Sequence, residues 1–129
     1  MKRNIREIYS AFNGKLVGTK EMKQYVCEVV ALMEDEIIEY VTSNCWFFGS
    51  MDDSLAFTFT GNDLKDKHLI FLSDELFMHD EEQIRYTIAH ETGHVILGHR
   101  NSILERQSKA EIYNQESEAD KFARKYIKD

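Results

Sequence analysis

The stretch "YTIAHETGHVILGH", residues 86–99, holds three histidines and one glutamate within an otherwise largely apolar segment. Apolar residues lie on several sides of this segment, which predicts a helix that is buried in the core. Imidazole and carboxylate side chains are costly to bury unless something binds them. We therefore expect His90, Glu91 and His94 to hold a ligand.

The ends of this helix follow from its flanking residues. The acidic "HDEEQ" (79–83) is typical of a helix start, and Gly98 is a natural stop, so we predict a helix over residues 80–98. After a polar loop, a further helix is expected over residues 108–127.

Two helices are predicted before these. Residues 4–12 form a short first helix that ends at "NGK". From Met22 to Tyr40 the apolar residues share one face, which predicts a single long helix over residues 19–41 with Thr19 as its N-cap.

Between the helices the pattern becomes that of strands. The segments "CWFF" (45–48), "LAFTFT" (55–60) and "HLIFL" (68–72) are rich in β-branched and aromatic residues and are separated by turn-forming sequences. They predict a small, mostly antiparallel, three-stranded sheet in meander order. The expected fold is α+β, one domain over residues 1–129, with N-terminal helices, the sheet, and then the histidine-bearing helix packed against a C-terminal helix.

Composition narrows the class of protein. The chain has 129 residues, 43% of them hydrophobic, and a formal net charge of -7, which argues against a general nucleic-acid binder. Cys27 and Cys45 have no C-x-x-C spacing and are expected to be buried and reduced. A signal peptide and a segment long enough to span a bilayer are both missing from the sequence, so we expect a cytoplasmic protein without a membrane anchor.

The residues from His90 to His94 have the form H-E-x-x-H. On a helix, the spacing of four brings both imidazoles to one face, one turn apart, where they can share a metal ion. Neutral imidazole suits Zn²⁺, and Glu91 lies beside that face, where it can accept a proton from an attacking water. We expect one zinc ion per chain.

A catalytic zinc site needs a third protein ligand. The pattern H-E-x-x-H-x-x-G-x-x-H requires glycine at position 97 and histidine at position 100, and this chain has Leu97 and Arg100 there. His99 is one place out of register, so we expect it to be a solvated histidine at the helix end. A glutamate from the following helix is the other route.

Glu116 and Glu118 in "NQESEADKFA" (114–123) are the two candidates for that glutamate. On a helical wheel Glu116 lies about 60° from the centre of the apolar face, and Glu118 about 100° from it on the other side. We therefore predict Glu116 as the ligand and Glu118 as solvent-facing. Asp120, four residues after Glu116, is expected to accept the second N–H of a ligand histidine.

The paired motifs in residues 68–124, "IRYTIAHETGH" and "ESEADKFA", resemble the ImmA/IrrE family of gluzincin-type zinc metallopeptidases. The resemblance implies zinc held by His90, His94 and Glu116, with Glu91 as general base and acid. It also implies proteolysis of a regulatory protein, such as a helix-turn-helix repressor of a phage or mobile element. This chain has few residues after the second motif, whereas many members of that family have extra C-terminal elements.

Several functional questions stay open at this stage. Tyr113 and His99 are candidate oxyanion donors by position, and either "LAFTFT" or "HLIFLS" can supply the sheet edge to which a peptide substrate adds as a strand. Two other functions remain beside the peptidase. One is a zinc-binding regulator that sequesters a repressor without cutting it, and the other is an interaction domain without metal.

Overall fold

The structure is a computed structural model that describes residues 4–50, 56–59, 67–98 and 109–127. Within these ranges helices and strands combine in the α+β class that the sequence predicts. In chain order they are α1 (Ile5–Phe12), β1 (Leu16–Val17), α2 (Lys20–Val30), α3 (Asp35–Asn44), β2 (Cys45–Ser50), β3 (Ala56–Phe59), β4 (His68–Ser73), a 3₁₀ turn (Asp74–Met78), α4 (Glu81–Ile96) and α5 (Lys109–Tyr126).

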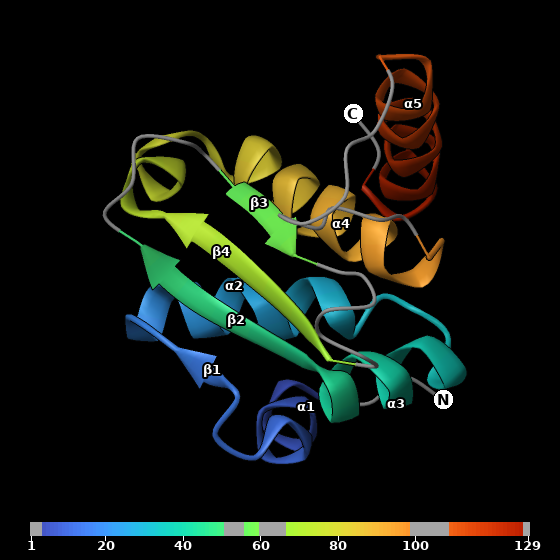
Figure 1. The fold of residues 1–129 in the computed structure, drawn as a ribbon. Coiled ribbons are helices and arrows are strands. Elements are labelled where there is room, and N and C mark those ends of the chain that lie inside the picture. Colours follow the sequence, from blue (N-terminus) through green and yellow to red (C-terminus); the bar gives the residue numbers. More distant parts are fainter. Residues whose placement is uncertain (1–3, 51–55, 60–66, 99–108, 128–129) are drawn as a thin grey trace.

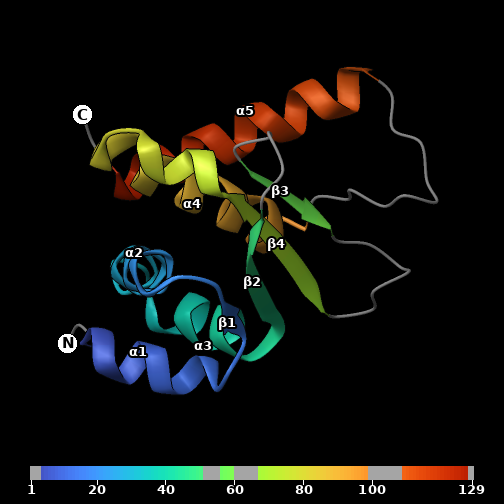
Figure 2. The ribbon, with the colours of Figure 1, turned by 90° about the vertical axis from the view of Figure 1, so that its left-hand side faces the viewer.

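The helices gather on one side of the sheet. Figures 1 and 2 show α2 and α4 against the same sheet face, with α1 and α3 at one end of the molecule and α5 packed on α4 at the other. The core between the layers is built from alternate strand residues, because neighbouring side chains of a strand point to opposite faces. Phe47 of β2 and Ile70 and Leu72 of β4 are fully buried.

The sheet differs from the predicted meander. The strand order is β1-β2-β4-β3, so β4 lies between β2 and β3 instead of at an edge. The pairs β1–β2 and β2–β4 are parallel, and only β3–β4 is antiparallel, so the prediction of a mostly antiparallel three-stranded sheet was wrong. The two-residue strand β1 adds a fourth member that is too short to give a periodic signal.

The prediction of one long helix over residues 19–41 was also wrong, because this segment forms two helices. As predicted, Thr19 caps α2, its hydroxyl accepting a hydrogen bond from the Met22 amide. The chain then leaves helical geometry before α3 begins after Glu34. The break lets both halves bury their apolar faces, Val26 in α2 and Ile38 in α3, around one compact core. Acidic residues in the first turn of α3 favour a new helix start at this point.

Other predicted features are confirmed. The helices predicted over residues 4–12, 80–98 and 108–127 appear as α1, α4 and α5, each within two residues of its expected ends. Cys27 and Cys45 are buried and free.

Candidate metal centre

The histidine-bearing helix α4 is anchored at its start by Asp80, whose carboxylate accepts a hydrogen bond from the Gln83 amide at 2.8 Å. Glu81 and Glu82 follow in the first turn, where acidic side chains suit the helix dipole. The helix ends at Ile96, and Gly98 has a φ of 72°, a left-handed conformation that glycine adopts without strain. Local sequence therefore fixes where this helix starts and stops.

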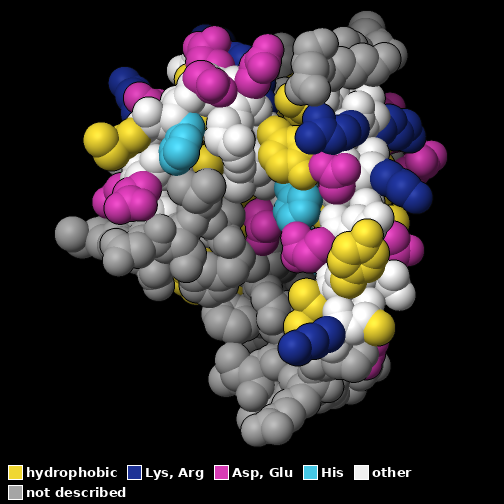
Figure 3. Space-filling model, turned by 90° about the horizontal axis from the view of Figure 1, so that it is seen from above, with side chains coloured by type: hydrophobic (Ala, Val, Ile, Leu, Met, Phe, Trp, Pro, Cys, Tyr) yellow, Lys and Arg dark blue, Asp and Glu magenta, His cyan; other side chains and the backbone are white. Residues whose placement is uncertain are grey.

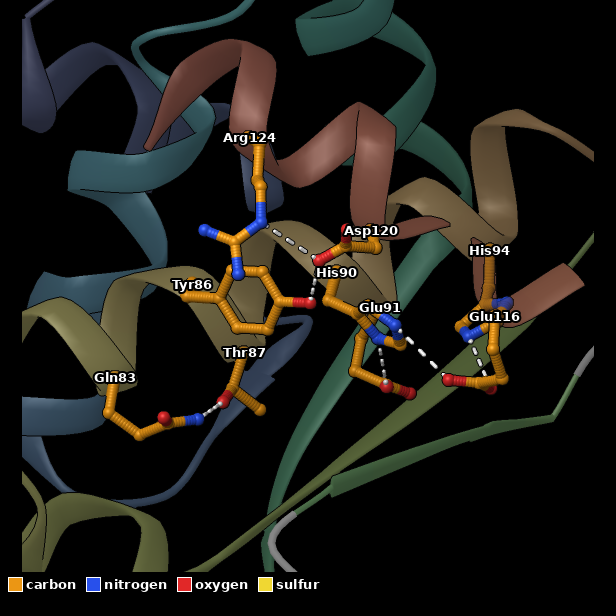
Figure 4. A network of polar contacts seen from close by, with 9 residues as sticks. All are labelled: Gln83, Tyr86, Thr87, His90, Glu91, His94, Glu116, Asp120 and Arg124. Carbon is orange, nitrogen blue, oxygen red and sulfur yellow. Dashed lines mark hydrogen bonds and ion pairs between the residues drawn. The ribbon is translucent and has the colours of Figure 1, made fainter. Parts of the chain in front are cut away.

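Two helices bring three potential metal ligands together. His90 and His94 project from α4 toward Glu116 of α5, as Figure 4 shows. Their donor atoms all lie within 4.8 Å of one another. The imidazoles are mostly buried, with 14% and 13% of their side-chain surfaces exposed, whereas the Glu116 side chain is 55% exposed. The cluster is thus open to solvent on the α5 side.

The distances in this cluster suit a tetrahedral metal. His90 Nε2 lies 3.1 Å from Glu116 Oε2, and His94 Nε2 lies 3.1 Å from Glu116 Oε1. Ligand atoms about 2.0–2.2 Å from a tetrahedrally coordinated zinc ion are about 3.3–3.6 Å apart, which follows from tetrahedral geometry. Two imidazole nitrogens and one carboxylate are also a donor set typical of catalytic zinc. By both spacing and chemistry the three residues fit the metal that the sequence predicts.

Glu91 lies beside the ligands and contacts one of them. Its carboxylate is 3.2 Å from His90 Nδ1, and its side chain is 9% exposed. Burial disfavours a charged His90, but the carboxylates of Glu91, Glu116 and Asp120 outweigh burial and raise the pKa of His90 above its usual value. His90 Nδ1 thus faces Glu91, and Nε2 faces Glu116.

The structure gives Asp120 different partners from the one predicted. Instead of a histidine, its Oδ1 accepts hydrogen bonds from Tyr86 Oη at 2.5 Å and Arg124 Nε at 3.2 Å. Asp120 is one turn beyond Glu116 along α5, and Tyr86 is one turn before His90 along α4, so this contact lies next to the ligand cluster (Figure 4). The carboxylate beside His90 Nδ1 is that of Glu91, which takes the place predicted for Asp120.

Tyr86 was missed by sequence reasoning, although its spacing of four before His90 is a usable signal. Its ring centroid lies 5.7 Å from that of His90, and the Arg124 guanidinium lies over the same tyrosine, 5.2 Å from its ring centroid. Burial and the Asp120 carboxylate raise the pKa of Tyr86 to about 12, so it remains a hydrogen-bond donor at neutral pH. Tyr86, Asp120 and Arg124 therefore form a polar bridge between α4 and α5.

Gly93, inside the H-E-x-x-H motif, sets how closely the two helices approach. A Cβ atom at this position would lie 3.0–3.2 Å from the Phe122 side chain of α5. That spacing is tighter than ordinary carbon contacts of about 3.5–4.0 Å. The missing side chain therefore allows α5 to come close enough for Glu116 to reach the histidines.

The remaining predicted site residues have other positions. Tyr113 is on α5 and is 74% exposed. Glu118 is also exposed and is not part of the ligand cluster. His99 lies outside the described residues.

On the face that carries α5, a partly exposed histidine adjoins acidic side chains (Figure 3).

Comparison with known proteins concerns the half of the chain that contains this cluster. Residues 68–129 match the family model Peptidase U49. The matched region begins at β4 and includes both helices of the candidate metal centre. This similarity supports a peptidase, as the sequence predicts. No curated protein and no solved structure matches the chain.

None of the described helices is long and apolar enough to cross a bilayer.

Proposed function

We propose that this protein is a zinc-dependent endopeptidase in which His90, His94 and Glu116 hold one zinc ion per chain. The observation that carries the proposal is the convergence of two imidazole nitrogens and one carboxylate from two helices, within 4.8 Å of one another. The family match over the same region supports hydrolysis of peptide bonds.

A bound zinc ion would supply a Lewis acid that polarises the substrate carbonyl and acidifies water. Glu91 accepts the proton of the attacking water and returns it to the leaving amine. Its largely buried position beside His90 favours this role, because the carboxylate is adjacent to the ligand cluster without being part of it. Asp120 supports the site indirectly, by orienting the tyrosine that packs beside His90. Tyr113 remains a candidate oxyanion donor.

The sheet order favours one of the two strands for substrate binding. Both sides of β4, which contains "HLIFLS", are already paired, one with β2 and one with β3. Among the described strands β3, from "LAFTFT", is at the sheet edge, and it packs against α4. We propose that an extended peptide pairs with β3 by main-chain hydrogen bonds.

A regulatory protein is the proposed substrate. The resemblance to ImmA/IrrE peptidases favours a helix-turn-helix repressor of a phage or mobile element, cut inside the cell. A second function uses the same zinc site but sequesters the repressor without cleaving it. In that case the three ligands are required and Glu91 is not.

The role of Glu91 separates these functions. Glu91→Gln retains the ligands and removes the proton acceptor, so zinc content is expected to stay near one ion per chain while proteolysis falls by about 10²–10⁴-fold. Zinc is measured by elemental analysis. Proteolysis is measured on casein and on any helix-turn-helix repressor encoded beside this chain's gene.

Two results would contradict the proposal. Absence of zinc from protein prepared without chelators would show that the three residues do not form a zinc site. Proteolysis by Glu91→Gln at the wild-type rate would show that Glu91 is not the general base. Repression that is still relieved in cells by Glu91→Gln would favour sequestration.

The third ligand is tested by a matched pair of carboxylates on α5. Glu116→Ala is expected to lose zinc, because its oxygens lie 3.1 Å from both histidine nitrogens. Glu118→Ala, two residues away on the exposed side, is expected to retain it. The reverse result would assign the ligand to Glu118.

A further inference from the structure

Residues of α1 and α2 line a groove. Helix α1 lies at the opposite end of the molecule from α5 (Figures 1 and 2). We name this groove the α1–α2 groove; its volume is about 680 Å³. Three of its lining residues are cationic, namely Arg6, Lys20 and Lys23, and among the described residues no aspartate or glutamate lines it. In a chain with a formal net charge of -7, this is a local reversal of charge.

Carboxylates on the same two helices lie elsewhere. Glu7 of α1 is engaged with Asn4 in the capping box at the helix start. Glu28 of α2 lies 3.2 Å from Arg85 of α4, and its other carboxylate oxygen accepts a hydrogen bond from Gln24, which lines the groove. Glu21 is about 100° around α2 from Lys20. The Glu28 carboxylate is balanced by Arg85, and no carboxylate of the described residues lines the groove itself.

The groove also has an apolar part. Ile5 and Tyr9, one turn apart on α1, are 41% and 50% exposed, and the buried Cys27 of α2 lines the floor. Lys23 Nζ lies 5.9 Å from the centroid of the Tyr9 ring. Large side chains exposed beside a cavity offer anchoring contacts to a binding partner, and aromatic residues are enriched among such contacts.

We propose that the α1–α2 groove docks an acidic segment of a partner protein. Carboxylates of the segment pair with Arg6, Lys20 and Lys23, and its apolar side chains pack on Ile5 and Tyr9. A peptide fits better than a small anion, because the cations and the exposed apolar side chains share one open groove. The repulsion expected from the acidic remainder of the molecule makes this groove the preferred place for such a segment.

Binding is tested with the full chain and a fluorescein-labelled peptide in which glutamates alternate with leucine and phenylalanine. The controls are the same peptide with lysine in place of glutamate and a peptide of glutamate alone. We expect saturable binding of the first peptide, measured by fluorescence anisotropy, and at least tenfold weaker binding of both controls. Equal binding of the lysine peptide, or of the glutamate-only peptide, would overturn the proposal, the latter by showing a site for simple anions.

A pair of charge reversals locates the site. Lys20→Glu with Lys23→Glu is expected to weaken peptide binding at least tenfold. Lys109→Glu with Lys121→Glu makes the same change in net charge on α5 and is expected to change binding less than twofold. Equal losses in both double variants would show a general charge effect and overturn the proposal.

A measurement on the unaltered chain guards against misfolding of these variants. Peptide titration into ¹⁵N-labelled protein is expected to shift amide resonances of α1 and α2. Shifts confined to α4 and α5 would overturn the assignment to the groove. Because this titration does not depend on zinc or cleavage, its outcome is independent of the proposed peptidase activity.

Discussion

Helices α4 and α5 both contribute to the candidate metal centre, but they are held in the molecule in different ways. In α4 eight residues are buried, including Ile84, Ile88 and Val95. In α5, which is two residues longer, only Ala119 and Ala123 are buried. The two histidines therefore stand on a core element, whereas Glu116 stands on a helix at the surface.

The difference divides the site into a rigid part and an adjustable part. The histidine positions are set by the packing that stabilises the whole domain. The position of Glu116 depends on a few specific contacts between helices, the polar bridge at Asp120 and the close approach at Gly93. Changes in α4 should thus affect stability first, and changes at the contacts of α5 should affect metal binding first.

The largest expected effect is in the core of α4. Ile88→Ala is expected to lower the free energy of unfolding by about 2–5 kcal/mol, because Ile88 is fully buried and truncation leaves a cavity. Ile112→Ala on α5, where the side chain is 46% exposed, should change it by about 0.5 kcal/mol or less. Urea denaturation measures both. Equal losses would show that α5 is as integral to the core as α4.

An intermediate effect is expected at Gly93. Alanine favours a helix by about 1 kcal/mol, while overpacking against Phe122 costs about 1–3 kcal/mol, so the free energy of unfolding falls by about 0–2 kcal/mol. The added methyl group displaces α5, and we expect zinc affinity, measured by competition with a chelating dye, to fall about tenfold.

The displacement of Glu116 is isolated by a double-mutant cycle. In a chain that already contains Glu116→Ala, only weak binding by the two histidines is left, and it is measured at higher zinc concentration. Gly93→Ala should have little further effect on this residual affinity, because the ligand that it displaces is gone. An equal loss of zinc affinity in both backgrounds would show that Gly93→Ala acts through the histidines. The distinction between a rigid α4 and an adjustable α5 would then be wrong.

The smallest expected effect is at Glu34, which joins α3 to α5. Glu34 accepts hydrogen bonds from Tyr126 and Lys125, and these partners lower its pKa to about 2. An ordinary glutamate has a pKa of about 4.3, so the unfolded state binds a proton first, and the stabilisation present at neutral pH is lost as pH falls from about 4.3 to 2.

Comparison of Glu34→Gln with wild type tests this. The melting temperature of the variant should be lower at pH 7, and the gap should close between pH 4.3 and 2 and shrink with added salt, because Glu34 is exposed. Glu39→Gln, on the same helix, is the control for general effects of charge and acid. A gap that is independent of pH would show that the carboxylate charge contributes nothing to the docking of α5.

The parts of the site that depend on helical periodicity could be predicted from sequence. A spacing of four places His90 and His94 on one face, and the same geometry selects Glu116 over Glu118 for the inward side of α5. These relations are local, so each is fixed once the helix forms. The ends of α4 were equally readable, from Asp80 and Gly98.

What could not be predicted depends on contacts between distant segments. The parallel pairing of β2 with β4 requires β3 to be passed over, and nothing within "CWFF" or "HLIFL" specifies which neighbour each strand takes. The break between α2 and α3 contains neither proline nor glycine, so only the packing of both halves reveals it. Asp120 accepts a hydrogen bond from Tyr86 instead of a histidine. Its partner depends on how α4 and α5 are shifted along each other, which is set by tertiary packing and not by the local sequence.

The contact of Glu34 with Lys125 joins residues 91 positions apart in the chain. The entropy lost on closing a loop rises with its length, so this contact costs more entropy to form than contacts between elements that are neighbours in the chain. Glu116 reaches the histidines only when α5 has docked. The candidate metal centre is therefore complete only after α5 has docked on α4, and the rate at which the refolding chain acquires the proposed zinc ion would report the docking of this one helix.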